Sequence, residues 1–415
     1  MTSLQASDMA HPASARATSA PGDSNDHPAA LVASAAGGRV LPNGLVRPLE
    51  SRDLEQVATL FLKTFRRKRK ASQAQSAIEE AAGYMRQLYL EGPGSEGGAG
   101  SLVRVDAQGD IVGFLGILKN SYTLDGQALS AGVISTLMAA DEHVAGPVGP
   151  QLVRALNQSP FDLVFADSAN RASLALSRPL KYELLPLNCL EWACVFRPSA
   201  LLVHKMQQKW PLTPAAILAP MAHVADFAAG RVLRSRRKRS APGRWQDEAI
   251  DAAAFAEIAP TFLDAFRLRP VWARPELDWL LGQAAQRRNS GPLNFRVVRD
   301  GSDAPIGCYA FYAEKHGVAR VLQVLARDGR WGAVIDCLRQ TTEEMGCIGV
   351  HGAAQPSMMP HLYAHPGLFF YYAGGTMVRS ANKDVIQAVR DNRALIGGLA
   401  GDRWTRLGTD EFGSA

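Results

Sequence analysis

Residues 144–149 combine small side chains with the start of a predicted helix, a pattern that can hold a phosphate anion. The segment reads Val-Ala-Gly-Pro-Val-Gly, and the apolar spacing predicts a helix over 148–156. Free amides and the helix dipole favour an anion at a helix N-terminus, and a diphosphate approaches closely only where side chains are small. Pro147 lacks an amide hydrogen, which would weaken binding by about 1 kcal/mol if that donor were needed. An ordinary turn between a strand and a helix is the alternative interpretation.

Other patterns associated with chemistry are incomplete. His361 and His365 have a spacing that suits a metal ion, but His351 is the only obvious third ligand, so we expect no metal site. The glycine-rich stretch 92–100 lacks the Lys-Ser/Thr and the helix of a nucleotide-binding loop, and it predicts a connector. The chain also has no Gly-x-Ser-x-Gly nucleophile motif and no dinucleotide fingerprint.

The positive charge of the chain is concentrated in two short runs. The 415 residues include 45 Lys+Arg and 39 Asp+Glu, and the runs at 66–70 and 234–239 supply five positive charges each. A nucleic-acid-binding face usually interleaves such charges with aromatic residues, which neither run does, so we expect no nucleic-acid partner.

The cysteines and the apolar segments favour a cytoplasmic protein. The five cysteines form no CxxC pair and no disulfide framework. The longest apolar stretch, 211–230, holds three prolines as well as His223 and Asp226, so we expect no membrane span. Association of the amphipathic 201–240 segment with a membrane surface stays open.

Hydrophobic periodicity predicts an α/β fold with two mixed-sheet domains joined by a helical linker. Residues 43–200 predict the order β-α-α-β-β-β-α-β-α-β-β, closing with strands near 184–187 and 190–196, and a similar order repeats over 241–405 with a last strand at 369–378. Residues 1–42 have no periodicity and are expected to be a disordered tail. We expect an amphipathic helical linker at 201–240 and a C-terminal tail at 406–415.

Four local stretches on this framework resemble the GNAT superfamily of acyl-CoA-dependent N-acyltransferases. They lie at 46–54, 109–116, 137–156 and 167–182 and resemble its opening strand and helix, its third strand, its cofactor-binding strand–loop–helix and its last conserved helix. The resemblance covers about 45–200. It implies a tandem GNAT protein whose second copy is degenerate, because residues 326–332 lack the Gly-x-Gly of the cofactor loop.

The resemblance implies that the first copy binds acetyl-CoA. The strand before the turn at 144–149 would pair with the pantetheine arm through its main chain and polarise the acyl carbonyl. The turn itself would hold the diphosphate. The residues concerned are Leu137, Met138, Ala139, Val144, Ala145, Gly146, Val148 and Gly149. Asn170 matches the family's asparagine beside the pantetheine arm, although capping of the next helix explains an asparagine there equally well.

The catalytic groups that the resemblance implies are less clear. The family often has a tyrosine that protonates the departing thiolate, and its position is occupied here by Ser177, a poor general acid. Tyr182, five residues later, is the candidate acid. Glu142, beside Asp141 and His143 at the end of the cofactor strand, is the candidate base, although family members often act there through a water.

The resemblance therefore implies an N-acyltransferase that acts on the amine of a small molecule, with an amino sugar as one guess. The basic run at 66–70 would border the acceptor site and favour an anionic acceptor. One alternative is a Fem-type aminoacyl transferase, a tandem GNAT fold that uses aminoacyl-tRNA. The other is a scaffold that has lost catalysis, in line with Val144, Pro147 and Ser177. The acceptor, the acyl length and the oligomeric state do not follow from the sequence.

Overall fold

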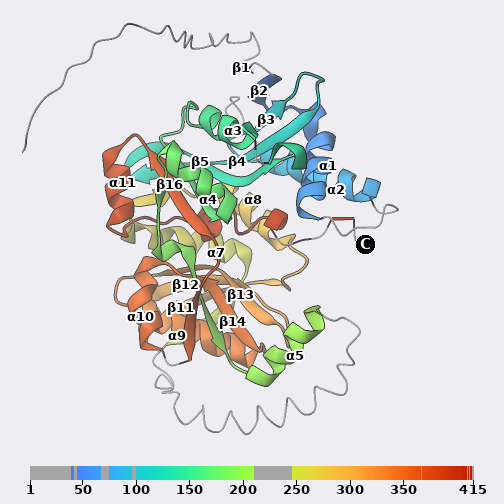
Figure 1. The fold of residues 1–415 in the computed structure, drawn as a ribbon. Helices are drawn as coiled ribbons and strands as arrows, with labels where there is room; N and C mark the ends of the chain where they lie inside the picture. The colour runs from blue at the N-terminus through green and yellow to red at the C-terminus, as the bar shows by residue number, and fades with distance from the viewer. Residues whose placement is uncertain are drawn as a thin grey trace, which may run out of the picture.

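The computed structural model describes residues 39–41, 44–66, 74–95, 100–144, 146–209, 245–365, 367–408, 410 and 412–413. The expected tail at 1–42 lies outside the described residues except for the strand β1 (Arg39–Leu41), which pairs with the next strand instead of forming part of a disordered tail. Of the expected linker, only the part within α5 (Pro198–Lys209) is described. The predicted α/β class is confirmed, since two mixed sheets with flanking helices lie one above the other (Figure 1).

Sheet A forms the upper body in Figure 1 and belongs mainly to the first half of the chain. Its order is β1, β2 (Gly44–Pro48), β3 (Leu102–Val105), β4 (Ile111–Leu124), β5 (Gln127–Ala139), β6 (Leu163–Ala169), β16 (Gly375–Ser380) and β7 (Glu183–Leu184), and β10 (Leu268–Pro270) pairs with β4. Its helices are α1 (Leu54–Phe65), α2 (Ala74–Tyr89), α3 (Val148–Leu156) and α4 (Arg171–Ser177). Side chains alternate across the sheet, so Phe114 packs in the core under α1 and α2, whereas Leu115 packs in the core under α3.

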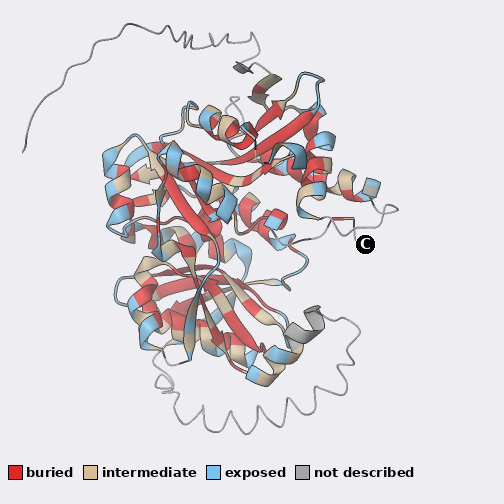
Figure 2. Ribbon diagram, in the orientation of Figure 1, coloured by how far each residue is buried: buried red, intermediate tan, exposed pale blue. Residues whose placement is uncertain are grey.

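Sheet B forms the lower body. Its order is β15 (Leu368–Tyr372), β8 (Leu190–Val195), β14 (Gly349–Ala353), β13 (Val318–Ala326), β12 (Pro305–Tyr312), β11 (Leu293–Arg299) and β9 (Gln246–Ile250). The helices of the second half are α7 (Ala252–Ile258), α8 (Arg274–Ala285), α9 (Trp331–Glu344), α10 (Met359–Ala364) and α11 (Lys383–Arg390). Buried residues run along both sheets in Figure 2. None of the described helices combines the length and the apolar character that crossing a membrane requires.

A paired arginine and aspartate fix the entry into α1. Arg47 at the end of β2 donates to both carboxylate oxygens of Asp53, over 2.6 and 2.8 Å, and the amide of Glu50 donates to the same carboxylate over 2.8 Å. The pair ties the strand to the helix start, and the bidentate geometry fixes the direction in which the chain turns. This is the structural role of the 46–54 stretch that resembles the opening of a GNAT domain.

The two halves of the chain exchange strands. β8 belongs to the first half, but it lies in sheet B between β14 and β15, with Cys194 opposite Val350. β16 belongs to the second half, but it lies in sheet A between β6 and β7, with Val378 opposite Phe165. The expected division at residue 200 is therefore crossed in both directions. The single strand expected at 369–378 is two strands, β15 and β16, and they lie in different sheets.

The chain after α11 returns to the first half. Tyr122 on β4 donates its hydroxyl to the carbonyl of Leu395 over 3.2 Å, and β10 in turn pairs with β4. Phe412 is fully buried, with its ring 5.9 Å from that of Phe61 and 6.0 Å from that of Tyr84. The expected C-terminal tail is thus, in its described residues, a segment packed against α1 and α2. The reason is apolar burial, which the predominantly polar composition of 406–415 concealed.

Candidate active site

Two parallel strands of sheet A separate and leave a cavity between them. β5 and β6 pair from Ala131 opposite Leu163 to Val133 opposite Phe165, and there the pairing stops although both strands continue. Beyond Val133, the edge of β5 that faces β6 has no strand partner among the described residues. A cavity of about 360 Å³ occupies the space. An unpaired strand edge beside a cavity offers backbone donors and acceptors to an extended ligand.

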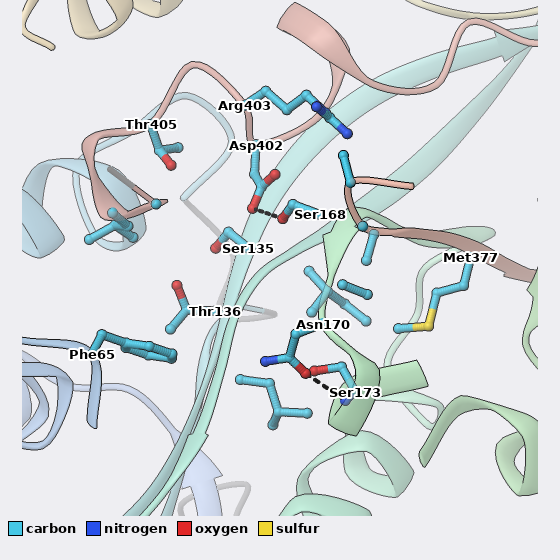
Figure 3. Close-up of a pocket in the computed structure, with 18 of the residues that line it drawn as sticks. Phe65, Ser135, Thr136, Ser168, Asn170, Ser173, Met377, Asp402, Arg403 and Thr405 are labelled. Atoms are coloured by element: carbon cyan, nitrogen blue, oxygen red, sulfur yellow. Dashed lines mark hydrogen bonds between the residues drawn. The ribbon is translucent and has the colours of Figure 1, made fainter. Parts of the chain in front are cut away.

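A bulge in β5 lies where the strands separate. Gly116 on β4 lies opposite Thr136, whereas the next residue, Ile117, lies opposite Ile134, so Ser135 is the extra residue. The Ser135 hydroxyl lies 3.2 Å from the Gly116 carbonyl and 2.9 Å from the Tyr89 hydroxyl. These contacts hold the bulge in place, and Ser135 and Thr136 both line the cavity (Figure 3).

The residues proposed from sequence to bind the acyl-CoA lie in different places. Leu137 and Asn170 line the cavity. Met138 is buried in the core under α1 and α2, and Ala139 ends β5. Val144 is 63 % exposed, and Ala145 lies outside the described residues.

The turn before α3 offers few donors to an anion. The amide of Gly146 donates to the His143 carbonyl over 3.0 Å. The first-turn amides of Val148 and Gly149 have no acceptor within the helix, and the described part of the chain supplies none from outside it. Pro147 and Pro150 in the same turn have no amide hydrogen. The turn therefore presents two amides to a ligand.

Asn170 has the capping role that was its alternative interpretation. Its Oδ1 accepts a hydrogen bond from the Ser173 amide over 2.9 Å, which caps α4 (Figure 3). Since the oxygen is used by the helix, the amide nitrogen is the group left for the cavity that Asn170 lines. The capping and the binding roles are therefore compatible in one side chain.

The two catalytic candidates from sequence, Tyr182 and Glu142, do not lie together in the cavity. Tyr182 lines the cavity, but its hydroxyl donates to Oδ1 of Asn157 over 2.9 Å, and burial raises its pKa well above the ordinary value. Glu142 is exposed in the short helix Asp141–His143 and does not line the cavity. Ser177, at the family's tyrosine position, donates to the carbonyl of Leu174 over 2.7 Å.

The C-terminal segment adds an acidic pair that sequence reasoning missed. Asp402 lines the cavity, accepts a hydrogen bond from Ser168 over 2.8 Å, and donates its own amide to Oδ1 of Asp167 over 3.1 Å. Burial and the neighbouring Asp167 carboxylate raise the pKa of Asp402 well above its ordinary value. A side-chain carbon on Gly401 would collide with the Asp167 carboxylate, so the close approach requires glycine there. The run of glycines and apolar residues at 397–404 was the available signal.

The second sheet has a similar divergence, but its space is filled. β13 and β14 pair as far as Arg320 opposite His351 and then separate. The segment around Gly398 occupies the gap, and the amide of Leu399 donates to Oε1 of Gln323 over 3.1 Å. Only about 20 Å³ remains there. Among the described residues, no group of three His, Cys, Asp or Glu side chains is placed to hold a metal ion.

The chain is similar in fold to several solved structures. A conserved protein from Enterococcus faecalis V583, described as a probable N-acyltransferase, has a TM-score of 0.52 at 10 % identity over 81 % of this chain and 72 % of that chain. A GCN5-related N-acetyltransferase from Anabaena variabilis has a TM-score of 0.51 at 11 % identity, over 83 % and 74 %. One from Kribbella flavida has a TM-score of 0.48 at 14 % identity, over 81 % and 70 %. No family model and no curated protein matches the chain.

Proposed function

Because the chain has the fold of the GCN5-related N-acetyltransferases, we propose that it transfers an acyl group from acyl-CoA to an amine. The observation that carries the proposal is the separation of β5 from β6 beyond Val133, around a cavity of about 360 Å³. A pantetheine arm is an extended chain with two amide groups, and an unpaired strand edge can bind it as a further strand.

The residues present fit an acyl-CoA better at its thioester end than at its diphosphate end. The free edge of β5 at Leu137 and the amide nitrogen of Asn170 supply polar contacts for the arm. The amides of Val148 and Gly149 supply two donors for the diphosphate, fewer than a turn without prolines would give. When bound, the acyl-CoA supplies an activated acyl thioester.

Asp402 is the best placed proton acceptor among the described residues of the cavity. Its raised pKa makes its carboxylate a stronger base than that of an ordinary aspartate, which favours proton abstraction. In the proposed reaction the amine nitrogen forms a bond to the acyl carbon, and Asp402 accepts the proton of the amine. The carbon–sulfur bond breaks with its electron pair on sulfur, so CoA leaves as a thiolate. Ser168 orients the carboxyl, and amides on the free edge of β5 stabilise the negative charge on the acyl oxygen.

Calorimetry of the full chain with acetyl-CoA, CoA and tRNA tests the proposal. Ser173 lines the cavity from α4 through a side chain that no described hydrogen bond uses, so Ser173→Trp fills the cavity and Ser173→Ala is the matched control. We expect acetyl-CoA to bind the wild type and Ser173→Ala alike, and to bind Ser173→Trp at least about tenfold more weakly, which is 1.4 kcal/mol. Binding of tRNA alone would instead support the aminoacyl transferase, and no binding of any ligand would support the scaffold.

A further inference from the structure

Three arginines lie near one another in the lining of the cavity. Arg287 follows α8, Arg320 lies on β13, and Arg403 belongs to the C-terminal segment, and all three line the cavity. They come from parts of the chain that are far apart in sequence. Because like charges repel, such a cluster is stable only where anions compensate it.

Arg403 has its compensation within the chain. Its guanidinium contacts Oε1 of Glu191, lies 3.4 Å from Oδ2 of Asp167, and donates to the Asp167 carbonyl over 3.1 Å. Two carboxylates therefore compensate the positive charge of Arg403.

Glu191 is fully engaged by its neighbours. Besides Arg403, it accepts a hydrogen bond from Tyr371 over 2.7 Å, and its Oε2 lies 3.2 Å from Nδ1 of His351. Burial alone would raise the pKa of Glu191, but the His351 contact and the charge of Arg403 hold it well below the usual range. Glu191 is thus charged, and its charge is already matched by Arg403.

Arg320 is a largely buried cation with no such partner. Within the described residues its guanidinium makes no hydrogen bond or ion pair with a carboxylate. Burial, with repulsion from Arg287 and Arg403, outweighs the attraction of the more distant Glu191 carboxylate and lowers the pKa of Arg320 to about 10. Arg287 stacks on the Tyr312 ring at 5.1 Å and donates to the Arg403 carbonyl. A buried charge that no carboxylate contacts directly is costly, so the part of the cavity beside Arg320 is suited to an anion from outside the chain.

We propose that Arg320 and Arg287 form a subsite for a carboxylate carried by the substrate. A guanidinium binds a carboxylate through two parallel hydrogen bonds, a planar match that fixes orientation as well as charge. None of the described residues of 141–149 lines the cavity, so this subsite is separate from the turn expected to hold the diphosphate. The subsite narrows the proposed transferase function, on which it rests, to substrates with a carboxylate on the acceptor amine or on the acyl group.

Calorimetry with disodium succinate and with neutral succinamide tests the subsite without any turnover. We expect the wild type to bind succinate and not succinamide, and Arg320→Gln to bind succinate at least about tenfold more weakly. Arg393→Gln, which removes one exposed charge outside the cavity lining, is the matched control and keeps the wild-type affinity. Arg320→Gln should melt no lower than the wild type, because it removes an uncompensated charge. Equal succinate binding in Arg320→Gln and wild type, or none in either, overturns the proposal.

A comparison of acetyl-CoA with succinyl-CoA separates the two sources of the carboxylate. If the acyl group carries it, succinyl-CoA binds the wild type about tenfold more tightly than acetyl-CoA, and Arg320→Gln loses the preference. If the acceptor carries it, both thioesters bind alike and succinate still binds beside acetyl-CoA. Succinate binding without any thioester binding would refute the transferase function and leave the anion subsite standing.

Discussion

The Ser168 hydroxyl donates to Oδ2 of Asp402 over 2.8 Å and joins two residues that are 234 positions apart. Ser168 lies on β6, at the mouth of the diverging strands, and Asp402 arrives from the end of the chain. The cavity of sheet A is therefore completed by residues that follow the strands of sheet B in the sequence. The proposed chemistry depends on this junction.

Replacing Asp402 by asparagine should remove the proposed base and keep the shape of the site. Asparagine still accepts a hydrogen bond from Ser168, so binding of acetyl-CoA should be unchanged while kcat falls by about 100-fold or more. In the wild type kcat/KM should rise with pH as Asp402 loses its proton, and the variant should lack this rise. Steady-state kinetics across pH with an active acceptor measure both effects. A kcat within twofold of the wild type would exclude Asp402 as the base.

The raised pKa of Asp402 also makes a prediction about stability. A carboxyl whose pKa is raised by folding stabilises the protein fully below its unfolded pKa of about 4, and this contribution is lost as the pH rises through the folded value. Asp402→Asn stays neutral throughout. The variant should therefore match the wild type near pH 4 and become relatively more stable as the pH rises above that value. Melting curves of both proteins at matched ionic strength measure this effect. A difference in stability between variant and wild type that does not change with pH would contradict the raised pKa.

The two roles of Asn170 can be separated by two substitutions. Aspartate keeps the oxygen that caps α4 but loses the amide nitrogen, whereas alanine loses both. Asn170→Asp should keep the wild-type melting temperature and bind acetyl-CoA several-fold more weakly. Asn170→Ala should show the same weakening plus a loss of about 1 kcal/mol in stability. Unchanged affinity in both variants would leave Asn170 as a cap only.

Phe412→Ala, which removes the ring, should destabilise the protein and damage the cavity. The ring is fully buried against Phe61 and Tyr84, and such large-to-small changes cost about 3–5 kcal/mol. Release of this anchor should also displace Asp402 and lower activity. Tyr363→Ala, at a ring that is 70 % exposed, is the matched control and should leave both the stability and the activity unchanged. Chemical denaturation measures the loss, and equal stability of the two variants would contradict the packing.

Tyr182 and Glu142 should matter little to catalysis. The Tyr182 hydroxyl is held by Asn157, so Tyr182→Phe should cost about 1 kcal/mol of stability and leave kcat within about twofold. Glu142→Gln, at an exposed position, should leave both quantities unchanged. Loss of about 100-fold in kcat for either variant would restore that residue as a catalytic group.

The sequence was most informative where structure is local. The helix predicted at 148–156 has those bounds in the structure, and the strand placed before the turn is the end of β5. Apolar spacing and capping residues act within a few positions, so a single sequence contains them. The bulge at Ser135 is a different case, because it depends on the register against Gly116.

The exchange of strands could not be predicted from pattern alone. Cys194 on β8 and Val378 on β16 are both buried, and either strand could fill the gap beside β6 or beside β14. Local hydrophobicity specifies that a strand is buried but not which sheet receives it. The same limit concealed Asp402, whose importance comes from contacts with residues more than 200 positions earlier.

The position of β16 has a consequence for synthesis of the chain. On the ribosome the strands β2 to β6 emerge well before Gly375–Ser380, so the β16-facing edge of β6 stays open while the second half is translated. At about 5–20 residues per second this interval is on the order of tens of seconds. An open apolar edge invites pairing with other nascent chains. The β16-facing edge of β6 is therefore expected to be exposed in the nascent chain until Gly375–Ser380 has been synthesised.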